Sequence, residues 1–126
     1  MVVERPGREQ LCTIAFSCAN TCGPYQQVGH KAFVIYDLGQ VQGIGLLHIQ
    51  LKIDVSFNVR LLGPDLNVTC HTHVFATSAS PPPKVIVATC RGNSARFIKI
   101  ETVDIGASID ICFFNYFLQG RKFSNS

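Results

Sequence analysis

Apolar and polar residues alternate strictly between Leu47 and Leu61. Every odd position in this stretch is aliphatic or aromatic, and every even position is polar or charged. Because successive side chains of a β-strand point to opposite faces of the sheet, the pattern predicts one dry face and one wet face. It predicts in particular that Ile53, Val55 and Phe57 are core residues. The stretch is longer than an ordinary strand, so we expect one long bent strand or two strands continued through a bulge.

A second alternating segment follows a turn at Gly63-Pro64-Asp65, where proline fixes φ and aspartate can bond its own backbone. Between Leu66 and Thr77 the apolar positions include Cys70, and the opposite, polar positions include His71 and His73. Two alternating segments joined by a short turn are typical of an antiparallel hairpin. The sequence therefore predicts a long amphipathic hairpin.

Glycine and proline divide the rest of the chain into short segments rich in β-branched and aromatic residues. We interpret glycines 39, 43 and 45 as a turn before the long strand. No helical period extends beyond two turns, and several short strands without helices indicate two packed sheets. The predicted fold is an all-β, antiparallel β-sandwich or jelly roll, stabilised by disulfides. The further strands are expected at Leu11 to Cys18, Lys31 to Leu38, Lys84 to Cys90, Ala95 to Ile100 and Ser108 to Leu118.

Composition limits the alternatives. The 126 residues suffice for one domain, which we place at 11–120, with flexible segments at 1–10 and 121–126. A hydrophobic fraction of 47% against 15% charged residues excludes an intrinsically disordered chain. No apolar run is long enough for a membrane-spanning helix. A net charge of +3 is too small to indicate a nucleic-acid partner.

Six cysteines in a short chain are typical of a disulfide framework, which persists in oxidising compartments. We expect Cys70 to pair with Cys90 or Cys112. Asn67-Val68-Thr69 is a candidate N-glycosylation site, so the protein is expected to be a secreted glycoprotein. The first ten residues contain no apolar signal-peptide region, which leaves a cytosolic or viral origin as the alternative. The disulfide candidates are Cys12, Cys18, Cys22, Cys70, Cys90 and Cys112.

His71 and His73 are the sharpest candidate metal ligands, because side chains at i and i+2 of a strand point the same way. A third ligand would have to come from His48, His30 or a distant Asp, with His48 the foremost candidate because it lies on the polar face of its own strand. No Asp, Glu, His or Cys follows His73 within sixteen residues, so we expect no metal and no cofactor. Cys18 and Cys22 have a spacing that zinc tolerates, but a disulfide role is favoured over a zinc site.

No motif for nucleophilic or paired-carboxylate catalysis is present. The favoured function is a small binding module, not an enzyme, that recognises a protein or a glycan through its loops. Two alternatives stay open: a structural, capsid-like self-assembling protein, and a metal-dependent enzyme that uses His71 and His73. A homo-oligomer is possible in either class. The loops proposed for recognition are Gly23 to Gly29, Ser78 to Pro83 and Arg91 to Ser94.

Overall fold

The computed structural model describes residues 29–79, 82–90 and 92–119. This part of the chain contains six strands and no helix, and therefore no helix that could cross a membrane. The strands are β1 (Phe33–Leu51), β2 (Phe57–Leu62), β3 (Val68–Val74), β4 (Val85–Ala88), β5 (Ser94–Thr102) and β6 (Ile111–Leu118).

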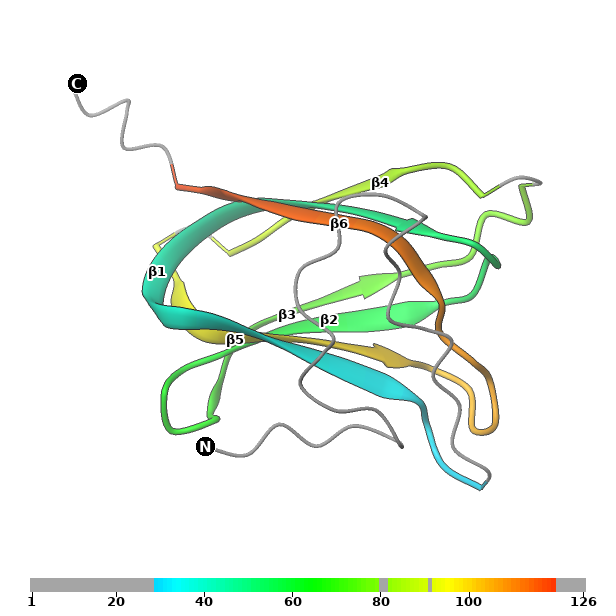
Figure 1. Cartoon of the computed structure of the whole chain (residues 1–126), viewed down its shortest axis with the longest axis horizontal. Helices are drawn as coiled ribbons and strands as arrows, with labels where there is room; N and C mark the ends of the chain where they lie inside the picture. Colours follow the sequence, from blue (N-terminus) through cyan, green and yellow to red (C-terminus); the bar gives the residue numbers. More distant parts are fainter. Residues whose placement is uncertain (1–28, 80–81, 91, 120–126) are drawn as a thin grey trace.

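Strand β1 belongs to both layers of an antiparallel sandwich (Figure 1). Its first half pairs with β5, which pairs with β2, which in turn pairs with β3. Its second half pairs with β4 along one edge and with β6 along the other. Bending carries β1 from one layer into the other, so the two layers are hydrogen-bonded into one nearly barrel-like sheet. The predicted all-β antiparallel sandwich is confirmed.

The bend in β1 lies where the sequence indicated a turn. Its register with β5 jumps from Asp37 opposite Phe97 to Gln42 opposite Ala95, so β1 bulges between these pairs. Gly39 has φ of +87°, a conformation that side chains disfavour, and its N–H donates to Asp37 Oδ1 at 2.8 Å. The interpretation of glycines 39, 43 and 45 as a turn before a strand was therefore wrong. They lie inside one strand and let it curve.

The prediction of continuous β-structure from Leu47 to Leu61 was also wrong. Strand β1 ends at Leu51 and β2 begins at Phe57, and residues 52–56 cross from one layer to the other. The crossing residues keep the alternation of polarity, so the sequence pattern conceals the break. Ile53 is 60% exposed rather than buried. Val55 is half-buried against the core, and Phe57 is fully buried, as predicted.

Strands β2 and β3 form the predicted hairpin, shorter than expected. The pair Leu61–Cys70 is followed by Leu62–Val68, so β3 carries a bulge at Thr69. The bulge shifts the side-chain alternation by one position. Val68 is consequently exposed, although the pattern placed it on the same face as the buried Cys70.

The core lies between the two layers and is built from the inward-facing residues of the strands. The odd positions of the segment from Leu47 to Leu61, on either side of the crossing, contribute to it as predicted: Leu47, Ile49, Leu51, Phe57, Val59 and Leu61. A disulfide joins Cys70 of β3 to Cys90, which follows β4, and so links the two layers. This confirms one of the two predicted pairings. Cys12, Cys18, Cys22 and the side chain of Cys112 lie outside the described residues.

Candidate functional site

Both ends of β1 lie at the same end of the sandwich, because the strand bends in its middle. Phe33 begins β1 opposite Glu101, and Leu51 ends it opposite Ile111. Phe57 at the start of β2 pairs with the last residues of β3 and β5. The described connecting residues 52–56, 75–79, 82–84 and 103–110 therefore converge on one end, at the right of Figure 1.

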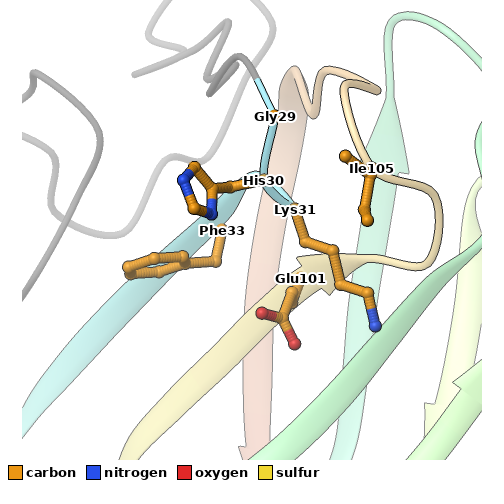
Figure 2. A pocket seen from close by; sticks show the side chains of 6 residues that line it. All are labelled: Gly29, His30, Lys31, Phe33, Glu101 and Ile105. Carbon is orange, nitrogen blue, oxygen red and sulfur yellow. The ribbon is translucent and has the colours of Figure 1, made fainter.

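This end of the sandwich carries an open pocket of about 350 Å³, which we call the end pocket. In Figure 2 the rings of His30 and Phe33 lie on one side of it, Lys31 and Ile105 on the other, and Glu101 between them. Gly29 completes the lining. The pocket brings together residues some 70 positions apart in the sequence.

Backbone contacts fix the segment that carries His30 and Lys31 to the loop after β5. The N–H of Gly106 donates to the carbonyl of His30 at 2.9 Å, and Gly106 adopts φ of +84° to make this turn. Ala32 exchanges two bonds with Thr102: its N–H donates to Thr102 Oγ1 at 3.0 Å, and the N–H of Thr102 donates to its carbonyl at 2.8 Å. Thr102 is fully buried, so these two hydrogen bonds fix the backbone that carries the pocket residues.

Glu101 is held by two cations on neighbouring positions of the sheet. Arg60 Nη1 donates to Glu101 Oε1 at 2.8 Å, and Lys99 Nζ lies 3.9 Å from Oε2. The same ammonium group lies 4.7 Å from the centre of the Phe33 ring. These contacts orient the carboxylate and the ring, and they leave lone pairs of the carboxylate that can accept hydrogen bonds from a ligand.

The end pocket combines an aromatic ring, a carboxylate acceptor, an ammonium donor and an imidazole. A polyhydroxylated ligand suits such a lining, because its hydroxyl groups both donate and accept hydrogen bonds. A flat apolar face of the same ligand can pack on the aromatic ring. A few convergent polar groups beside an apolar surface are typical of small-molecule binding sites.

His71 and His73 share one face of β3, as predicted, and both contact Asn58. His71 Nε2 lies 3.0 Å and His73 Nδ1 lies 2.8 Å from Asn58 Oδ1. An amide oxygen accepts hydrogen bonds, so each ring donates to Asn58 in the tautomer that satisfies its contact. The contacts occupy one nitrogen of each ring and leave the other nitrogen as the one that could coordinate a metal.

His48 does not complete this pair. It lies in the other layer, opposite Ile86 and Asn115, and its ring contacts that of Phe117 with centroids 4.7 Å apart. Within residues 29–79, 82–90 and 92–119, no three His, Cys, Asp or Glu side chains come together as a metal site.

The other candidate positions fall at different places on the molecule. Asn67 is exposed in the β2–β3 turn, and its Nδ2 donates to Asp65 Oδ2 at 2.6 Å. Ser78 lies at the end of the sandwich that carries the pocket, where Asp54 accepts hydrogen bonds from Thr77 and Ser78. Residues 92–94 lie at the opposite end, since Ser94 pairs with Gly43 beside the bend of β1. Residues 23–28, 80, 81 and 91 of the proposed recognition loops lie outside the described residues.

Sequence reasoning missed most of the end pocket. Of its residues it named only Gly29, as the end of a recognition loop, and His30, as a remote metal-ligand candidate. Lys31, Phe33, Glu101 and Ile105 carry no local motif, and the pairing of Phe33 with Glu101 that brings them together depends on strand register. In the sequence Ile105 is distinguished only by the glycine that follows it, and its exposed side chain becomes apparent only in the structure.

Comparison with known proteins identifies the fold. No protein-family profile and no curated protein matches the sequence. The lectin domain of lectinolysin, solved with Lewis B antigen, aligns with a TM-score of 0.65 at 16% identity over 77% of this chain and 72% of that one. A fucose-binding module from Streptococcus pneumoniae aligns with a TM-score of 0.63 at 19% identity over 76% and 70%.

A third structure is the family 32 carbohydrate-binding module of Streptococcus pneumoniae EndoD. It aligns with a TM-score of 0.58 at 11% identity over 82% of this chain and 78% of that one. At these identities the likeness is one of fold. The chain has the β-sandwich architecture found in these lectin and carbohydrate-binding modules.

Proposed function

We propose that this protein is a small glycan-binding module that holds a sugar residue in the end pocket. One observation carries this function: the aromatic ring of Phe33 and the carboxylate of Glu101 line one open pocket at the loop end of the sandwich. The proteins that share this fold support the same class of ligand, because they include a lectin domain, a fucose-binding module and a carbohydrate-binding module.

Each group in the pocket has a role in this function. The ring of Phe33 packs against the C–H face of the sugar, which is its apolar side. Glu101 accepts hydrogen bonds from hydroxyl groups, and charged acceptors form the stronger bonds of this kind. Lys31 and His30 lie at the open side and donate to hydroxyl or ring oxygens. Binding needs no covalent step, and the module is not an enzyme.

An extracellular location fits this function. The Cys70–Cys90 disulfide links the two layers, and bridges of this kind persist in oxidising compartments. Asn67 is exposed in a turn, where an oligosaccharide can be attached without entering the core. Expression in a eukaryotic secretory host tests both points. Glycosidase treatment should lower the mass of the secreted protein, and an Asn67→Gln variant should show no such change.

A glycan array with the full chain tests the function, followed by calorimetric titration of the best ligand. We expect binding to a defined set of glycans. Phe33→Ala should weaken it roughly tenfold or more, because the sugar loses its stacking surface. Glu101→Gln should also weaken it, since a neutral amide replaces the charged acceptor.

Phe117→Ala is the matched control for Phe33→Ala. Phe117 is also a surface aromatic, 42% exposed, but it lies on β6 in the other layer. Its removal should leave glycan affinity unchanged. An array without any signal would refute the function, and equal losses in the Phe33 and Phe117 variants would refute the site.

A further inference from the structure

A second pocket, of about 470 Å³, adjoins the end pocket on the outer face of the β5–β2 layer. Its floor is apolar: Ile35 and Leu62 belong to a small outer cluster with Phe97 and are 8% and 6% exposed. Leu66 from the β2–β3 turn and Val68 at the start of β3 form its rim. We call it the face pocket. Phe33 lines both pockets, so the two are contiguous along the sheet.

Strand register sets two cations at the side of this apolar floor. Lys99 of β5 lies directly opposite Ile35 of β1 and directly opposite Arg60 of β2. The next row of the sheet carries Phe33 opposite Glu101. Arg60 and Lys99 therefore stand in the face pocket, while Glu101 lies one row further on and lines the end pocket.

In this region the two cations outnumber the one carboxylate that pairs with them. Arg60 and Lys99 share one carboxylate, that of Glu101, at 2.8 and 3.9 Å. Among the described residues, no acidic side chain lines the face pocket itself. Within the part of the chain that the structure describes, Arg60 donates one side-chain hydrogen bond, from Nη1, although a guanidinium carries five N–H donors. The face pocket thus has an excess of positive charge and of donors beside an apolar surface.

We infer that the face pocket is a subsite for an acidic sugar residue, one that carries a carboxylate or a sulfate, next to the residue held in the end pocket. The inference rests on the proposed function and names its ligand class. The acidic group accepts hydrogen bonds from Arg60, whose planar fork matches carboxylate and sulfate geometry, and Lys99 adds a point charge. The apolar part of the residue packs on Ile35, Leu62 and the Phe33 ring.

A neutral residue suits this pocket less well. Covering Arg60 and Lys99 with a ligand removes water from two cations that share one carboxylate, and desolvated charges are costly unless they are paired. An anionic ligand supplies the missing negative charge. The preference for an acidic glycan should therefore be larger than the net charge of +3 alone would produce. It should weaken as the salt concentration rises, because salt screens the charges at the rim of the pocket.

An array of matched glycans tests the inference with the full chain. Each neutral oligosaccharide is printed beside its sulfated and its sialylated form, so the two sources of negative charge are compared on one scaffold. We expect the acidic forms to bind roughly tenfold or more tightly than their neutral parents. Equal or tighter binding of the neutral forms would overturn the subsite and leave the proposed function intact. Binding to no glycan at all would refute both.

Two variants locate the effect, measured by calorimetric titration with the best acidic glycan and with its neutral parent. Lys99→Gln keeps the Arg60–Glu101 ion pair, so the fold should be retained. It should reduce acidic binding by about threefold to tenfold more than it reduces neutral binding, because Lys99 also helps to orient Glu101 and Phe33 in the end pocket. Arg60→Gln should abolish the preference, with its thermal unfolding recorded alongside.

Lys84→Gln is the matched control. Lys84 is exposed, lies over the ring of Phe113 in the other layer, and lines neither pocket. Its removal lowers the net charge by the same amount as Lys99→Gln. If the Lys84 and Lys99 variants lose acidic binding equally, the preference reflects general charge, and the subsite is refuted.

Discussion

Tyr36 and Phe114 stack face to face across the core, with ring centroids 4.2 Å apart and 12° between the ring planes. Tyr36 lies in the first half of β1, which pairs with β5, and Phe114 lies in β6, which pairs with the second half of β1. Both side chains are almost fully buried. The stack therefore joins the two layers through a side-chain contact in the core, in addition to the backbone connection that the bend of β1 provides.

Phe114→Ala should lower the free energy of unfolding by about 3–5 kcal/mol, because it removes a buried ring and leaves a cavity. Chemical unfolding in urea measures the change. Phe117→Ala, at an exposed position on the same strand, should change stability by less than about 1 kcal/mol. Similar losses in the two variants would mean that the stack does not link the layers.

Phe57 and Ile53 both occupy apolar positions of the alternating pattern, but in the structure Phe57 is buried and Ile53 is exposed. Phe57 is 1% exposed at the start of β2, and Ile53 is 60% exposed in the connection between layers. Phe57→Ala should cost about 3–5 kcal/mol and Ile53→Ala less than about 1 kcal/mol. Urea unfolding of the two variants decides between the observed break and a continuous strand, which predicts comparable losses.

These two residues show how far the sequence predicts the fold. Alternation identifies which side chains face the core on either side of residues 52–56, because a strand has a period of two. It does not reveal the crossing, because residues 52–56 happen to continue the alternation of polar and apolar residues. At Gly39 the sequence suggested a break that the structure does not have. Glycine is typical of turns, but here the positive φ of Gly39 allows one strand to bend and belong to both layers.

The candidate site was less predictable than the core. The pairing of Cys70 with Cys90 was one of two stated possibilities, because a cysteine on a buried face has few partners. The pocket depends instead on the register between β1 and β5, which sets Phe33 opposite Glu101. Register follows from the packing of the whole sheet and leaves no local motif. A sequence read position by position therefore does not identify the residues of this pocket.

Removal of the disulfide by Cys70→Ala with Cys90→Ala should lower the free energy of unfolding by about 2–4 kcal/mol, largely because the unfolded chain gains freedom. Thermal and urea unfolding measure this loss. A disulfide presents no thiolate, so Cys70 and Cys90 should also resist alkylation in the native, non-reduced protein. Ready alkylation of Cys70 and Cys90 without reductant would contradict the bridge.

Asp37 and Arg96 make stability depend on pH. The hydrogen bond from Arg96 is the main cause that holds the pKa of the Asp37 carboxyl below its ordinary value of 3.8; burial opposes it, and the N–H of Gly39 adds to it. Because the pKa is lower in the folded state, the stabilisation is complete above the unfolded pKa and is lost as pH falls through the folded value.

Asp37→Asn should accordingly reduce stability by less than about 1 kcal/mol at neutral pH, since both partners are partly exposed. The difference from the unmodified protein should shrink as the pH falls below the ordinary carboxyl pKa of 3.8. Urea unfolding at a series of pH values measures it. A difference that stays constant over this range would exclude the Asp37 carboxyl as its source.

The last prediction concerns the two histidines of β3. His71 and His73 each direct a ring nitrogen at Asn58 Oδ1, within 3.0 Å and 2.8 Å, and the two nitrogens act as donors in these contacts. A catalytic zinc site needs three protein ligands, and the part of the chain that the structure describes brings no third ligand to this pair. Elemental analysis of native protein should therefore find no stoichiometric zinc or iron. His73→Ala should leave the metal content unchanged, as should His48→Ala, which serves as the control in the other layer. A metal present in equal amount to the protein, lost with His73 and kept without His48, would instead favour the metal-dependent enzyme over the glycan-binding module.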